Sequence, residues 1–151
     1  MRMPAKPRVG AAKAAVQSGG GLAGDSELAA YCPDLEQWPS IWRYEARDVA
    51  PGEELVACFR PFLRHLLSLD QSRKTLNRHR DNLWLLGSEL IRGLHDTPGS
   101  RRRPIRELVR AAVEEDGGPL LHRGSEEEQR SFDATCRKLY RFLQTQDTPS
   151  S

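Results

Sequence analysis

Cationic side chains are concentrated in the middle of the chain, and they are the residues best suited to bind a charged partner. Residues 71–110 include ten basic and four acidic residues, whereas residues 26–70 include four basic and eight acidic ones. Lys and Arg neutralise phosphates and Asn pairs with the edge of adenine, so this block indicates a polyanion such as DNA. The alternative is a solvated helix face followed by a basic loop. The candidate DNA-binding residues are Ser72, Arg73, Lys74, Thr75, Asn77, Arg78, Arg101, Arg102 and Arg103.

Metal and catalytic motifs are weak by comparison. The histidines are His65, His79, His95 and His122. None of them lies four residues from another or beside a cysteine pair. No metal site and no cofactor is therefore expected. His122 paired with Ser125 or Cys136 would be a nucleophile pair, but nothing in the spacing orients it. We therefore do not expect an enzyme.

The elements that position the basic block are predicted to be helices, in an all-α bundle of four to five. Residues 1–25 lack a hydrophobic period and predict a disordered basic arm. Residues 26–51 combine aromatic residues with prolines and predict an irregular segment packed on the domain. Residues 52–145 form the helical domain, and residues 146–151 a disordered tail. Helices are predicted at about 52–69, 72–94 and 104–115, with a fourth that begins at the capping box Ser125-x-x-Glu128.

Individual positions within these elements carry further expectations. Pro61 removes one backbone hydrogen bond and predicts a kink or a break in the first helix. Trp38 and Trp42 are interpreted as core anchors, with stacking on a partner as the alternative. His79 lies on the apolar stripe of the second helix and is interpreted as a core histidine. Leu85 lies almost opposite that stripe, which predicts that this helix packs on two sides.

The stretch FLRHLLSLDQSRKTLNRHRDNL, residues 62–83, resembles a known family. It is similar to the N-terminal core-binding (SAM-like) domain of tyrosine recombinases and phage-type integrases, through the pattern Ser72, Thr75, Leu76, His79 and Leu83. The resemblance covers about residues 52–94 well and 104–143 loosely. It implies a small helical bundle that grips DNA through the segment around residues 72–78.

The sequence also departs from that family. The family's catalytic domain, longer than this whole chain, is expected to be missing, and no His-x-x-Arg motif is present. Tyr140 lies at the edge of an amphipathic pattern, where a core or rim role is expected. The resemblance therefore implies a free-standing core-binding-like module without recombinase activity.

These observations lead to two hypotheses. The first is a non-catalytic accessory module from a mobile element that binds double-stranded DNA and assists a separately encoded recombinase. The alternative is a protein–protein interaction module, antitoxin-like or a regulator of another macromolecule, as the aromatic residues of 31–44 and the acidic flanks suggest. No apolar run is long enough to span a membrane. The isolated cysteines suit a reducing cytoplasm, so a cytoplasmic location is expected.

Overall fold

The computed structural model describes residues 23–121 and 124–147, so most of the predicted arm lies outside the described residues. Those residues form six α-helices and three short 3₁₀ helices, and they contain no strand beyond one isolated bridge, which confirms the all-α prediction. The α-helices are α1 (Ala23–Tyr31), α2 (Trp38–Trp42), α3 (Val49–Leu67), α4 (Arg73–Asp96), α5 (Ile105–Ala112) and α6 (Glu126–Asp147). The 3₁₀ helices are η1 (Leu35–Gln37), η2 (Ala46–Asp48) and η3 (Pro98–Arg102).

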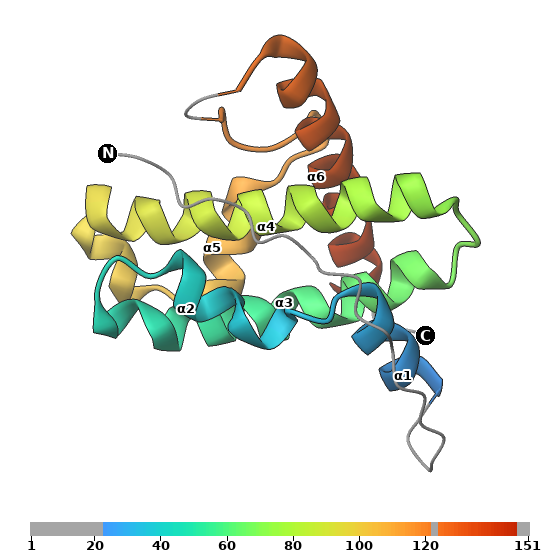
Figure 1. Ribbon diagram of the computed structural model, residues 1–151. Helices are drawn as coiled ribbons and strands as arrows, with labels where there is room; N and C mark the ends of the chain where they lie inside the picture. Colours follow the sequence, from blue (N-terminus) through green and yellow to red (C-terminus); the bar gives the residue numbers. More distant parts are fainter. Residues whose placement is uncertain (1–22, 122–123, 148–151) are drawn as a thin grey trace.

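Helices α3 and α4 form an antiparallel pair at the centre of the molecule (Figure 1). In the short loop that joins them, Asp70 has a φ of 55°, a left-handed conformation that Asp tolerates better than most residues. The buried apolar side chains of the pair include Leu55, Phe59, Phe62, Leu63, Leu66, Leu83, Leu86, Ile91 and Leu94. This burial supplies the main hydrophobic stabilisation of the bundle.

The aromatic segment before α3 closes one side of this core. Trp38 and Trp42 are 2% and 1% exposed, which confirms their interpretation as core anchors. Trp42 donates its indole N–H to the backbone oxygen of Trp84 at 3.0 Å. Its ring lies so close to Gly87 that a Cβ added there would stand 2.1 Å from the ring. Trp84 is 1% exposed as well, so the alternative interpretation, in which a tryptophan stacks on a partner, is wrong.

Helix α6 crosses α4 and packs against it (Figure 1). Its capping box is formed: Glu128 N donates to Ser125 Oγ at 3.1 Å, and Ser125 N donates to Glu128 Oε1 at 2.9 Å. Leu85 is half-buried against the core, in line with a central α4. Helix α4 is therefore held by α3 on one side and by α6 on another.

The structure differs from the sequence prediction in four places. Residues 26–51, predicted as an irregular segment, are largely helical, since they include most of α1, all of η1, α2 and η2, and the first residues of α3. A break at Pro61 does not occur, because the apolar face of α3 is buried on both sides of that residue and only one backbone bond is lost. Helix α1 begins at Ala23, so the arm prediction is wrong for residues 23–25. Helix α6 runs to Asp147, so the predicted tail begins too early.

Candidate nucleic-acid interface

The first turn of α4 is organised by Ser72 and Thr75. Ser72 is the N-cap residue, and its hydroxyl oxygen accepts a hydrogen bond from Thr75 N at 3.2 Å. The two hydroxyl oxygens lie 3.1 Å apart. An N-cap of this kind satisfies one of the free backbone donors of a helix start. Both residues therefore fix where α4 begins, directly beside the cations that follow.

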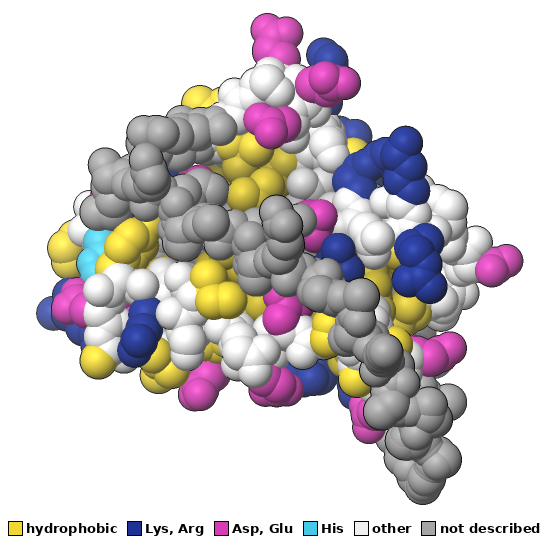
Figure 2. Space-filling view, in the orientation of Figure 1, with side chains coloured by type: hydrophobic (Ala, Val, Ile, Leu, Met, Phe, Trp, Pro, Cys, Tyr) yellow, Lys and Arg dark blue, Asp and Glu magenta, His cyan; other side chains and the backbone are white. Residues whose placement is uncertain are grey.

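Three cations of the first turns, which we call the basic surface, lie in solvent: Arg73, Lys74 and Arg78 are all exposed. None of them has an ion pair among residues 23–121 and 124–147. Lys74 and Arg78 are four residues apart, so they are neighbours on one row of the helix. Figure 2 shows Lys and Arg side chains gathered at the end of the molecule where α4 begins.

A buried polar network fixes how α4 faces α6. His79 Nδ1 lies 2.7 Å from Thr135 Oγ1, and Asn82 donates to Thr135 Oγ1 at 2.9 Å and to Ser131 O at 3.1 Å. His79 is 6% exposed, which confirms its interpretation as a core histidine. Burial, together with the positive charges of Lys138 and Arg78, lowers the pKa of His79 to about 4. Lys138 of α6 therefore adds a positive charge beside the basic surface, although it lies outside the basic block of residues 71–110.

Arg80 is a cation of the same turns that is not available to a partner. It donates to Asp81 Oδ1 at 3.1 Å and to the backbone oxygen of Tyr31 at 3.0 Å. The hydroxyl of Tyr31 donates in turn to the backbone oxygen of Leu76. Arg80 therefore ties α1 to α4.

Arg101 is bound internally at the opposite end of α4. Its guanidinium donates to Asp48 Oδ1 at 2.7 Å, and His95 Nε2 lies 2.8 Å from Asp48 Oδ2. We call these three residues the Asp48 cluster. Burial raises the pKa of Asp48, but hydrogen bonds from Arg101, His95 and two backbone N–H groups outweigh burial and hold this pKa well below its ordinary value. A fully buried, charged Asp48 thus engages Arg101.

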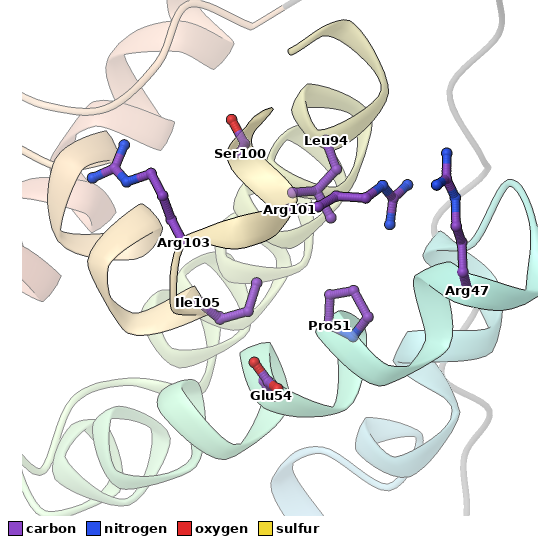
Figure 3. A pocket seen from close by; sticks show the side chains of 8 residues that line it. All are labelled: Arg47, Pro51, Glu54, Leu94, Ser100, Arg101, Arg103 and Ile105. Atoms are coloured by element: carbon purple, nitrogen blue, oxygen red, sulfur yellow. The ribbon is translucent and has the colours of Figure 1, made fainter. Parts of the chain in front are cut away.

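The arginines near this cluster line a cavity of about 280 Å³. Figure 3 shows Arg101 extending toward the side where Arg47 stands, whereas Arg103 points away from Arg101. Arg47 pairs with Glu45 at 3.1 Å and Arg103 approaches Glu107 at 3.8 Å. Glu54 adds a negative charge to the cavity wall. Internal carboxylates therefore balance much of the positive charge at this end.

The structure does not bring the two predicted groups of DNA contacts together. Arg101, Arg102 and Arg103 follow the C-terminal end of α4, whereas the basic surface lies at its N-terminal end. Helix α4 has 24 residues, and at a rise of 1.5 Å per residue its ends lie about 36 Å apart. Arg102 and Arg103 are exposed, but they lie far from the candidates at the start of α4.

Glu45, Asp48 and His95 offer ligand atoms within 4.8 Å of one another, which sequence spacing gave no reason to expect. The two carboxylates face opposite ring nitrogens: Asp48 lies at Nε2 of His95, and Glu45 lies 3.5 Å from Nδ1. A single ion binds one ring nitrogen, and Arg101 already occupies an oxygen of Asp48. This geometry suits an internal ion network better than a metal centre.

The pairing of His122 with Ser125 or Cys136, which the sequence did not favour, lies partly outside the described residues, because His122 is not among them. Cys136 is buried against the core, and burial raises the pKa of its thiol. A thiol with a raised pKa is a poor nucleophile at neutral pH.

Comparisons with models of protein families, with curated proteins and with solved structures find no match to this chain. Among the described residues, no helix has the length and apolar character needed to cross a membrane.

Proposed function

We propose that this chain is a non-catalytic DNA-binding accessory module that contacts the duplex through the start of α4. One observation carries the proposal: Arg73, Lys74 and Arg78 are exposed on adjacent turns and have no ion pair among the described residues. By contrast, Arg60, Arg64, Arg80, Arg92 and Arg101 all pair with carboxylates. Free cations on one rigid face are what a phosphate backbone requires.

The surroundings of the basic surface support the same proposal. Ser72 fixes the first residue of α4, and the His79–Thr135 contact fixes the rotation of α4 against α6. A binding face on a helix that is held on two sides is presented without a large ordering cost. The resemblance of residues 62–83 to recombinase core-binding domains points to the same turns.

The test is a mobility-shift assay with a mixed-sequence duplex at two or more salt concentrations. The double variant Lys74→Ala/Arg78→Ala is expected to bind about tenfold or more weakly, because two phosphate contacts are lost. The slope of log affinity against log salt should fall by about 1.8, which is the contribution of two phosphates. Arg43→Ala/Arg106→Ala removes the same formal charge from exposed positions on other elements and is the matched control. Absence of duplex binding by the wild-type protein at low salt contradicts the proposal.

A second candidate function, protein binding, is favoured by a groove between α3, α5 and α6. Its cavity of about 150 Å³ has apolar walls that include Cys58, Pro61, Val109, Phe142 and Leu143. Of the aromatic residues in 31–44, Tyr31, Trp38 and Trp42 are buried, and Tyr44 is half-buried against the core. A complex with one protein that resists salt and is lost in Leu143→Lys would favour this function over DNA binding.

A further inference from the structure

A second feature of the same helix start is a cavity between α1 and the first turns of α4. It has a volume of about 310 Å³ and is lined by Glu27, Ala30, Tyr31, Leu67, Gln71, Arg73, Leu76 and Asn77. Its apolar walls come from Ala30, Tyr31, Leu67 and Leu76, and two side-chain amides come from Gln71 and Asn77. We call it the Gln71 cavity.

The amides of this cavity lack partners. Oε1 of Gln71 is buried and accepts no hydrogen bond from the described residues. The side-chain amide of Asn77 likewise has no hydrogen-bond partner within the described part of the chain. A buried polar atom without a partner is costly, and in native proteins such atoms are rare. Gln71 lines the cavity, so a ligand with a polar edge bound there could supply the missing partner.

The charges around the cavity select the kind of ligand. Glu27 contributes a carboxylate to the wall, which repels an anion inside the cavity. Arg73 stands at the same wall and is exposed, while Lys74 and Arg78 lie on the adjacent row of α4. The interior therefore suits a neutral group with apolar faces and a polar edge, and the phosphates attached to that group belong outside, on the cations. A nucleobase on a sugar–phosphate strand has this distribution of charge.

The walls of the cavity are held in place by contacts between α1 and α4. Arg80 lies 5.8 Å from the centre of the Tyr31 ring and donates to the Tyr31 backbone oxygen at 3.0 Å. Tyr31 also bonds to the backbone of Leu76. Burial, the largest influence, raises the pKa of Tyr31, so its hydroxyl remains a neutral donor. A preformed cavity binds its ligand without first having to order its walls.

We propose that the Gln71 cavity binds one unpaired nucleobase of a DNA strand whose phosphates lie along Lys74 and Arg78. This inference rests on the proposed function, because the strand must first be held by the basic surface. An amide offers one donor and one acceptor side by side, which match the N6 donor and N7 acceptor of adenine. Exposed bases of this kind are recognised through their edges and by packing on apolar or aromatic side chains.

The experiment compares three duplexes of the same sequence at one salt concentration. One is fully paired, one carries a single extra adenine, and one carries an extra abasic nucleotide in its place. The abasic duplex has the same added sugar and phosphate but no base. Wild-type protein is expected to bind the extra-adenine duplex about tenfold more tightly than the abasic one, which is within the range of a good amide–adenine pair.

Gln71→Leu removes the amide with little change in side-chain size and should bring the ratio of these two affinities close to one. Gln146→Leu makes the same change at a glutamine that lines a different cavity, and it should keep the wild-type ratio. Equal binding of the adenine and abasic duplexes by wild-type protein, or an unchanged ratio in Gln71→Leu, overturns the inference but leaves duplex binding standing. Failure to bind any of the three duplexes overturns the proposed function and this inference together.

Discussion

The two ends of α4 carry the same kinds of side chain in opposite circumstances. At its start, Arg73, Lys74 and Arg78 face solvent without an ion pair among the described residues. Just beyond its end, Arg101 is held by Asp48, a carboxylate with no exposed surface. Removing a partner from a buried ion pair leaves an uncompensated charge, which is strongly unfavourable. An arginine that pairs with a buried carboxylate therefore stabilises the fold. Cations that have no such carboxylate beside them remain available to a partner.

Removal of the Asp48 carboxylate is expected to cause the largest loss of stability at either end of α4. Asp48→Ala leaves Arg101 and His95 without their common partner and two backbone N–H groups without an acceptor. We expect the free energy of unfolding to fall by about 3–5 kcal/mol, as measured by urea denaturation. Asp96→Ala is the matched control, because its exposed pair with Arg92 contributes at most about 1 kcal/mol. Equal losses of unfolding free energy in the two variants would mean that the Asp48 cluster stabilises the fold no more than an exposed ion pair does.

Lowering the pH should have a smaller effect on stability, and this effect should arise at His79 near the start of α4. The pKa of His79 is about 4 in the folded chain, well below its ordinary value of 6.5, because of burial and the nearby charges of Lys138 and Arg78. Between these values the unfolded chain binds a proton that the folded chain does not, so stability should fall as pH is lowered from 6.5 to 4. The loss should reach up to about 3 kcal/mol. The contribution of Asp48 persists through this window, because its own pKa is held below that of an ordinary carboxyl.

His79→Asn tests this assignment. It places an amide where Nδ1 contacts Thr135 but removes the titrating group. Denaturation curves recorded between pH 7 and pH 4 should lose most of their pH dependence in this variant. A wild-type slope that survives the substitution would assign the effect to other groups.

Much of the helical scaffold could be predicted from the sequence, because it depends on local patterns. The apolar stripe of α4, the capping box at Ser125 and the buried character of His79 all follow from spacing along one element. Of the two outcomes predicted at Pro61, a kink or a break, the break is wrong, because tertiary burial on both sides of the proline outweighs one lost backbone bond. Helix α1 was missed because its apolar positions, Leu28 and Tyr31, are too few to form a period of their own.

The candidate site was harder to predict, since it depends on contacts between distant segments. Nothing in the run Arg101–Arg103 indicates that Asp48, far away in the sequence, engages its first member. The exposure of Lys74 and Arg78 follows from the helical wheel. Arg73 and Arg80 both flank the apolar edge on that wheel, and the pairing of Arg80 depends on where α1 docks. The Gln71 cavity likewise needs α1, which has no clear sequence signal. Sequence thus supplied the residue types, and tertiary contacts decided which cations are free.

The smallest expected change in stability belongs to the variant with the largest expected change in binding. Lys74→Ala/Arg78→Ala should alter the free energy of unfolding by no more than about 0.5 kcal/mol, because both side chains are exposed and Ala is a good helix former. Arg101→Ala removes the same kind of group from the opposite end and should destabilise by several times that amount, since it leaves Asp48 short of a donor. Denaturation of both variants under one set of conditions gives the comparison directly. If the double variant were as unstable as Arg101→Ala, the start of α4 would also be structural, and its loss of DNA affinity would no longer indicate a binding surface.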